Sequence, residues 1–199
     1  MSTYLFDFYG VLLRHRPPAP KEALLRLVGA EDPVAFWTAY NELRPAYDAG
    51  VVSDERWWRQ MQVRLGLPDF DISEAVAQDF EPCTAPDLDV VGVAQELLGA
   101  GNAVGVLSNI PVGLGRMVRE RNESWLKEFT AVVLSGEIGV VKPDKRAFDV
   151  AVDALGANAK DTLFIDDTQG NVDAARAAGL RGYLYDGNLA ELRAECGLS

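Results

Sequence analysis

The sequence is poor in the residues that build disulfide frameworks and soft-metal sites. Its 199 residues include two cysteines, Cys83 and Cys196, and one histidine, His15. The two cysteines form no CxxC-type pair, so we expect ordinary free thiols rather than metal ligands. Any chemistry that depends on an imidazole would rest on His15 alone.

Long apolar segments and a leader are also lacking. No run of about 18 apolar residues occurs, and the N-terminus has no basic stretch followed by an apolar run and a small-residue cleavage site. We therefore expect a cytoplasmic protein without a membrane partner.

Positive charge is scarce. Nineteen Lys and Arg residues face 30 Asp and Glu residues, which gives a net charge of -11. A chain this acidic is repelled by phosphate backbones, so nucleic acid is excluded as a general partner. An anionic substrate would need a local cationic site. The 48% hydrophobic and 25% charged contents are ordinary for a soluble globular protein.

Short apolar runs alternate with stretches of helical spacing over most of the chain. This alternation predicts an α/β fold with a parallel sheet flanked by helices. The predicted strands are Tyr4 to Phe8, Ala103 to Leu107, Ala131 to Leu134, Thr162 to Ile165 and Gly182 to Tyr185.

A segment of different texture interrupts this pattern. From Pro20 to about Asp79 the chain carries helical spacing without strand runs, and Ser53 followed by acidic residues is typical of a helix start. Prolines mark its entry, and Thr84-Ala-Pro-Asp marks its exit. We predict a catalytic core of residues 1–14 and 88–199, with an inserted helical cap of residues 15–87.

Polar residues stand at or just beyond the carboxyl ends of the predicted core strands, the edge where ligands bind open parallel sheets. Any one of them taken alone is explained by a turn, a helix cap or an exposed side chain. They are Asp7 with Tyr9, Ser108 with Asn109, Lys142, and Asp166 with Asp167.

In this order, with a helical insert after the first strand, the chain resembles the haloacid dehalogenase superfamily. Asp7 matches the first motif, Ser108 the second, Lys142 in VVKPDKRAF the third, and the acidic pair in FIDDTQGNVDAARAAG the fourth. The stretch RPAYDAGVVSDERWW, residues 44–58, resembles a segment common in caps of this superfamily. The resemblance implies a Rossmann-like core with the cap inserted after the first strand.

The resemblance also implies a set of roles. Asp7 would be the nucleophile and carry an aspartyl-phosphate intermediate. Mg²⁺ would be held by Asp7, the carbonyl of Tyr9 and Asp166, with Asp167 close by or in an outer position. Ser108 and the amides of the Asn109 turn would hold phosphate oxygens.

Lys142 would supply positive charge to the nucleophile and the phosphoryl group. Arg44 of the cap is a candidate clamp for a second anionic group of the substrate. The cap aromatics at helical spacing, among them Trp57 and Trp58, are expected to be mainly core.

Tyr9 departs from the phosphatase pattern, which has a second aspartate there as general acid and base. A phenol titrates near about 10, so it is a poor base at neutral pH. The two-haloacid dehalogenases resemble this sequence in Asp-x-Tyr-Gly. Their leaving halide needs no proton, so their reaction requires no acid at this position. Their fourth motif differs, however, and Val11 and Phe148 also depart from their pattern.

Charge counting favours the metal-dependent reaction. Asp7, Asp166 and Asp167 bring three negative charges to one cleft, whereas Lys142 brings one positive charge, so a divalent cation is the natural counterion. We therefore predict a Mg²⁺-dependent phosphatase of small phosphorylated metabolites, as a monomer or homodimer. A haloacid dehalogenase and a catalytically weak phosphate-binding pseudoenzyme remain alternatives.

His15, with a pKa range suited to the missing acid and base duty, is either a replacement proton shuttle or an exposed linker residue.

Overall fold

The computed structural model describes residues 2–198 and contains a five-stranded sheet. The strand order is β3-β2-β1-β4-β5, and every neighbouring pair is parallel. The predicted parallel α/β core is therefore confirmed. The strands are β1 (Thr3–Phe6), β2 (Ala103–Ser108), β3 (Ala131–Leu134), β4 (Thr162–Asp166) and β5 (Arg181–Leu184).

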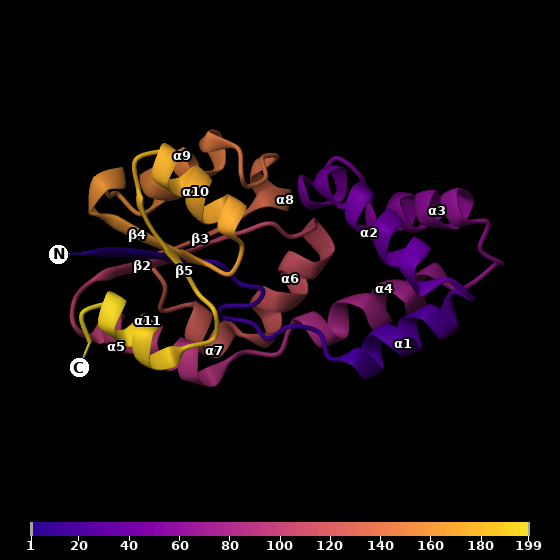
Figure 1. Cartoon of the computed structure of the whole chain (residues 1–199), viewed down its shortest axis with the longest axis horizontal. Helices are drawn as coiled ribbons and strands as arrows, with labels where there is room; N and C mark the ends of the chain where they lie inside the picture. The colour runs from indigo at the N-terminus through magenta and orange to yellow at the C-terminus, as the bar shows by residue number, and fades with distance from the viewer. Residues whose placement is uncertain (1, 199) are drawn as a thin grey trace.

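Helices cover both faces of this sheet (Figure 1). Helices α9 (Lys145–Ala154) and α10 (Gln169–Ala177) pack on one face, and α5 (Leu88–Gly99) and α11 (Leu189–Glu195) lie on the other. Two separate clusters of buried hydrophobic side chains result. The remaining core elements are α6 (Val112–Arg121), α7 (Glu123–Leu126), α8 (Ser135–Ile138), and the short 3-10 helices η1 (Glu81–Cys83) and η2 (Ala159–Asp161).

The first strand ends earlier than predicted. The apolar run suggested Tyr4 to Phe8, but β1 ends at Phe6. The chain then turns back on itself, with the Leu13 amide donating to the Phe8 carbonyl at 2.6 Å. Gly10 makes this turn possible, because its φ of 86° lies in the left-handed region and a Cβ there would lie 2.1 Å from Asp167 Oδ2. The turn thereby brings the loop after β1 against the loop after β4.

Four further helices lie beyond the carboxyl-end edge of the sheet and are called the cap helices here (Figure 1). The N-cap at Ser53 was predicted, and its side chain accepts from the Arg56 amide. Trp57, Trp58 and Met61 follow on one face of this helix and are fully buried, so these tryptophans are cap core. The cap helices are α1 (Pro18–Leu27), α2 (Pro33–Asp48), α3 (Asp54–Leu65) and α4 (Ile72–Phe80).

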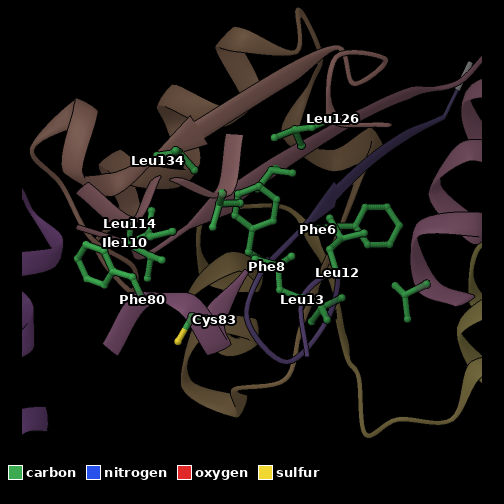
Figure 2. Close-up of a cluster of buried hydrophobic side chains, with 14 of the residues drawn as sticks. Phe6, Phe8, Leu12, Leu13, Phe80, Cys83, Ile110, Leu114, Leu126 and Leu134 are labelled. Carbon is green, nitrogen blue, oxygen red and sulfur yellow. The ribbon is translucent and has the colours of Figure 1, made fainter. Parts of the chain in front are cut away.

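One hydrophobic cluster continues from the sheet into the segments that join it to the cap helices. Figure 2 shows Phe80 next to Ile110, and Cys83 between Phe80 and the Phe8 and Leu13 side chains of the loop after β1. Burial of a side chain of this size stabilises a fold by about 1.5–3 kcal/mol, so this cluster holds the cap helices over the sheet edge. None of the helices in residues 2–198 combines the length and the apolarity needed to cross a bilayer.

Candidate active site

Three adjacent strands direct polar side chains to one edge of the sheet. Asp7 follows β1, Ser108 ends β2 and Asp166 ends β4, and β1 is paired with both of the other strands. A cavity of about 550 Å³ lies between this edge and the cap helices. The predicted residues that line it are Asp7, Tyr9, Arg44, Ser108, Asn109, Lys142 and Asp167, whereas Asp166 is fully buried behind it.

Lys142 is the buried positive charge of this cluster. Its Nζ lies 3.0 Å from Asp7 Oδ1 and donates to Asp166 Oδ2 at 2.6 Å. It also lies 5.1 Å from the centre of the Phe164 ring, on the strand beneath. Burial opposes the charged ammonium, but the two carboxylates outweigh this and raise its pKa. Lys142 is therefore a fixed cation beside Asp7.

Asp7 holds a strongly perturbed carboxyl group. Burial raises its pKa from 3.8 to about 6, and Asp166 adds to this, whereas Lys142 and the Ser108 hydroxyl act in the opposite direction. Oδ1 of Asp7 is buried, and within the described residues its one close polar contact is the ion pair with Lys142 at 3.0 Å. One lysine therefore does not satisfy this carboxylate.

This perturbation predicts that Asp7 destabilises the metal-free fold at neutral pH. A raised pKa means that the folded state binds the proton more tightly than the unfolded chain, so stability falls as pH rises from about 4 through about 6. At about 1.4 kcal/mol per pKa unit, Asp7→Asn should be more stable than the parent at pH 8 by up to about 3 kcal/mol. Urea unfolding in EDTA checks this, and the two proteins should converge at pH 4.

A surface aspartate serves as the control for that experiment. Asp144 caps α9, and its hydrogen bond from Arg146 lowers its pKa to about 2, so Asp144→Asn should not gain stability at pH 8. Equal stability of Asp7→Asn and the parent in EDTA at pH 8 would contradict the perturbation.

Asp166 is the most fully bonded carboxylate of the site. Oδ1 accepts from the Thr168 amide at 2.8 Å, and Asn171 Nδ2 donates to both oxygens at 3.1 Å. Together with Lys142 these contacts fix its orientation and occupy much of its lone-pair capacity. Asn171 thereby orders the loop of the fourth motif.

Asp167 is half-buried and faces the cavity. Its Oδ2 lies 3.3 Å from His15 Nε2. Burial and the neighbouring Asp166 raise its pKa, with His15 opposing. Carboxylate oxygens of Asp7, Asp166 and Asp167 all lie within 4.8 Å of one another. This all-oxygen cluster fits a hard divalent cation.

Asn109 contributes through its side chain in a way that the sequence did not indicate. Its Nδ2 donates to the Lys142 carbonyl and its Oδ1 accepts from the Lys142 amide, both at 2.8 Å. This pair of hydrogen bonds connects the loop after β2 to the loop that carries Lys142. Asn109 is therefore a positioning residue for the Lys142 ammonium group. This role follows from the contact between the two loops in space.

Tyr9 is directed toward the segment that leads into the cap helices. Its hydroxyl accepts a hydrogen bond from the Arg16 amide at 2.7 Å, and its ring meets the His15 ring edge-on. Burial raises the pKa of this hydroxyl above its usual value. The phenol therefore stays protonated at neutral pH and is a poorer base than a carboxylate.

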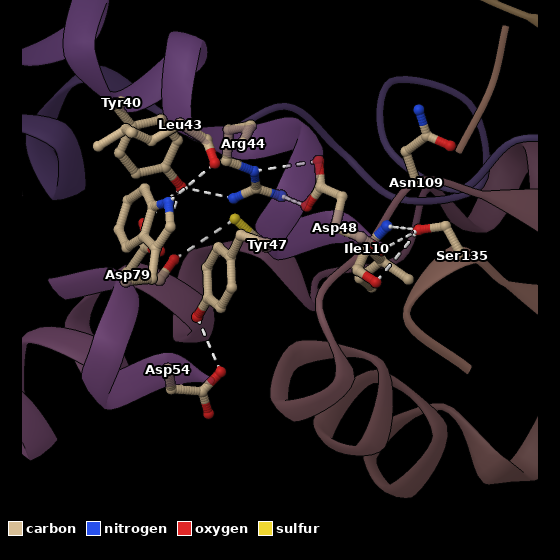
Figure 3. A network of polar contacts seen from close by, with 12 residues as sticks. Tyr40, Leu43, Arg44, Tyr47, Asp48, Asp54, Asp79, Asn109, Ile110 and Ser135 are labelled. Carbon is tan, nitrogen blue, oxygen red and sulfur yellow. Dashed lines mark hydrogen bonds and ion pairs between the residues drawn. The ribbon is translucent and has the colours of Figure 1, made fainter. Parts of the chain in front are cut away.

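The cap wall of the cavity carries a buried polar network (Figure 3). Arg44 NH1 donates to the Tyr40 hydroxyl at 2.9 Å, while Nε and NH2 contact the two oxygens of Asp48 at 3.2 and 2.6 Å. The Ser135 hydroxyl donates to the Asp48 carbonyl at 2.5 Å, which ties α2 to the core. Arg44 thus lines the cavity as predicted, with its guanidinium already held by cap residues.

The chain is similar in sequence to a family of hydrolases and to two named phosphatases. Residues 1–179 match the family model of the haloacid dehalogenase-like hydrolases. Phosphatase MT3486 of Mycobacterium tuberculosis is 38% identical over 94% of this chain and 88% of its own length. Sesquiterpene phosphatase astK of Aspergillus oryzae is 28% identical over 94% of this chain and 90% of its own length.

A solved structure shares the fold. The HAD family enzyme BT-2542 of Bacteroides thetaiotaomicron, in complex with magnesium and inorganic phosphate, superimposes with a TM-score of 0.75. It is 17% identical, and the match covers 94% of this chain and 96% of that one. At this identity the likeness concerns the fold alone.

Proposed function

The chain belongs to the haloacid dehalogenase-like hydrolases, and from that premise we propose that it is a Mg²⁺-dependent phosphatase of small phosphorylated metabolites. The observation that carries this proposal is the charge imbalance of the site. Three carboxylates meet within 4.8 Å around one lysine, and within the described residues the one close polar contact of Asp7 Oδ1 is its ion pair with that lysine. A haloacid carries a single negative charge, and its hydrolysis requires no metal. The three carboxylates therefore favour a phosphate ester as the substrate. The names of the two relatives and the magnesium–phosphate complex agree with it.

The residues that would hold the metal are Asp7, Asp167 and the carbonyl of Tyr9. Asp166 is the poorer direct ligand, because Lys142, Asn171 and the Thr168 amide already occupy it. We therefore reverse the order that the sequence suggested for the acidic pair. When bound, Mg²⁺ would neutralise the carboxylates and the phosphoryl oxygens and act as a Lewis acid.

This assignment predicts different losses of Mg²⁺ affinity for the two acidic residues. Asp166→Asn should weaken binding by about 10–100-fold, the usual cost of losing an outer-sphere partner, because it disturbs Lys142 and the loop. Asp167→Asn should weaken it further, because a direct ligand is lost. Isothermal titration calorimetry with Mg²⁺ measures both. A larger loss in Asp166→Asn would restore the order that the sequence suggested.

The chain's own residues would then perform two steps. A carboxylate oxygen of Asp7 attacks phosphorus while the ester P–O bond breaks, and the leaving oxygen keeps the electron pair and takes up a proton from solvent water to give the alcohol. Ser108 and Lys142 stabilise the negative phosphoryl oxygens, and Asn109 holds Lys142 in place. Water then attacks the same phosphorus and loses a proton to solvent, the acyl phosphate P–O bond breaks with its electron pair returning to the Asp7 carboxylate, and inorganic phosphate leaves.

Two other functions have Tyr9 as their supporting observation. A phenol in place of the second aspartate suits either a dehalogenase, whose leaving halide needs no proton, or a weak phosphate-binding pseudoenzyme. Phosphate release and halide release, each measured with Mg²⁺ and with EDTA, separate the three. We expect Mg²⁺-dependent phosphate release from 4-nitrophenyl phosphate and no halide from 2-chloropropionate. Metal-independent halide release would establish the dehalogenase, and neither product with retained phosphate binding would establish the pseudoenzyme.

A further inference from the structure

The cations of the cavity differ in whether a carboxylate neutralises them. Arg16 NH2 contacts Asp79 Oδ1 at 2.5 Å, Arg44 is held by Asp48, and Lys142 lies between Asp7 and Asp166. Lys21, on the first turn of α1, also lines the cavity. Within residues 2–198 its ammonium group makes a cation–π contact with an aromatic ring. Lys21 is thus the cavity cation that has no carboxylate partner in the part of the chain described.

That ring belongs to Trp37, which two cations share. Lys21 Nζ lies 5.8 Å from its centre, and the Arg16 guanidinium carbon lies 5.6 Å from it. Phe36 and Tyr40 each meet the indole at 5.0 Å between ring centres, so the ring is firmly supported. The cavity wall therefore presents an aromatic ring beside Lys21 and beside Arg16, whose charge is paired with Asp79.

The start of α1 adds to the local positive potential. The N-cap Pro17 makes no side-chain cap, and the first turn contains no acidic residue. A lysine near the positive end of a helix dipole is electrostatically unfavourable unless an anion is present. Independently of the helix, Arg16 Nε is buried without a hydrogen-bond partner, although the Arg16 side chain is 5% exposed and lines the same cavity. Both features favour a negatively charged ligand at this side of the cavity.

We propose that Lys21, Arg16 and Trp37 form a second oxyanion subsite on the cap wall. It would bind a carboxylate or a second phosphate on the leaving group, while the phosphoryl group lies at Asp7, Ser108 and Lys142. The carbon chain between the two anions would pack on the Trp37 indole. This inference rests on the proposed function and narrows its substrates to phosphate esters that carry a second anionic group.

Arg44, the residue predicted to clamp a second anionic group, is less suited to this role. All three nitrogens of its guanidinium already contact Tyr40 or Asp48, so a substrate anion would have to displace a buried partner. Lys21 has a flexible stem and, within residues 2–198, no such partner to lose, and it supplies the positive charge that an acidic chain needs to hold a substrate with two anionic groups.

The test uses phosphonates, which bind without being hydrolysed. Calorimetry in Mg²⁺ compares alkyl phosphonates with ω-carboxyalkyl phosphonates of the same chain length, over a series of lengths. Bisphosphonates of the same lengths show whether the second anion is a carboxylate or a phosphate. We expect about tenfold tighter binding of the ligand that carries the second anionic group at the best length, the gain of one charge-assisted contact. This gain should shrink as salt is added.

Variants of Lys21 locate the subsite. Lys21→Met should remove the tenfold gain and leave alkyl phosphonates unaffected, and Lys21→Glu should instead favour ω-aminoalkyl phosphonates. Lys127→Met is the matched control, because Lys127 is exposed and outside the cavity lining. A gain that survives in Lys21→Met, or no gain at any length, would overturn the subsite and leave the proposed phosphatase intact. Failure of every phosphonate to bind would overturn both.

Discussion

Asp7→Asn should abolish phosphate release, with a fall in kcat of at least about 10⁴-fold, the scale seen when a nucleophile is removed. The asparagine amide cannot form the acyl phosphate. The neighbouring Lys142 is held as a protonated ammonium group, so it cannot act as the nucleophile instead. The measurement is steady-state release of phosphate from 4-nitrophenyl phosphate in Mg²⁺. Because the same substitution should stabilise the metal-free fold at pH 8, loss of activity would not reflect unfolding.

Asp144→Asn is the matched control for this substitution. It makes the same chemical change on an exposed side chain at the start of α9, outside the cavity lining, and should keep the parent's rate. Retention of more than about one per cent of the parent's kcat by Asp7→Asn would contradict nucleophilic attack by Asp7, since nucleophile removal costs far more than that.

Tyr9→Asp should raise the rate by about 10²-fold, the lower end of what a positioned general acid and base contributes. The aspartate would protonate the leaving oxygen and then activate water, which the Tyr9 phenol, bonded to the Arg16 amide, does poorly. The gain should be largest when the leaving group is least stable as an anion. Phenyl phosphate and benzyl phosphate, of similar size but with phenol and alcohol leaving groups, measure this dependence.

Two further variants show whether another group supplies the proton. Tyr9→Phe should keep the parent's preference for phenyl over benzyl phosphate, because the hydroxyl is not needed as an acid. A selective loss of benzyl phosphate hydrolysis in Tyr9→Phe would make Tyr9 the acid, and the same loss in His15→Ala would make His15 the shuttle. A Tyr9→Asp variant no faster than the parent would contradict the missing-acid explanation.

The fold and most of the site could be predicted from local patterns. Apolar runs of four to six residues and the helix start at Ser53 depend on neighbours in sequence, and they placed the strands and cap helices well. Asp7, Ser108 and Asp166 meet because parallel strands bring their carboxyl ends to one edge. The early end of β1 at Phe6 was missed, because the turn through Gly10 is set by the approach of Asp167.

The contacts that orient the site could not be predicted in this way. Asn109 clamps the backbone of Lys142 from 33 residues away, and Arg16 pairs with Asp79 across 63 residues. Such pairs depend on how loops and cap helices pack in space, which no local spacing encodes. Arg44 is a different case, because Tyr40 and Asp48 lie one helical turn before and after it on α2, where i,i+4 spacing already places them within reach of its guanidinium.

A covalent phosphoryl group on Asp7 is the most direct test of the central claim. The enzyme is mixed with 4-nitrophenyl phosphate and Mg²⁺, quenched in acid within the first turnovers, digested and analysed by mass spectrometry. We predict one phosphoryl group on the peptide that contains Asp7, absent when EDTA replaces Mg²⁺ and absent in Asp7→Asn. Steady phosphate release with no phosphorylated peptide, or with the label on another residue, would contradict the proposed mechanism.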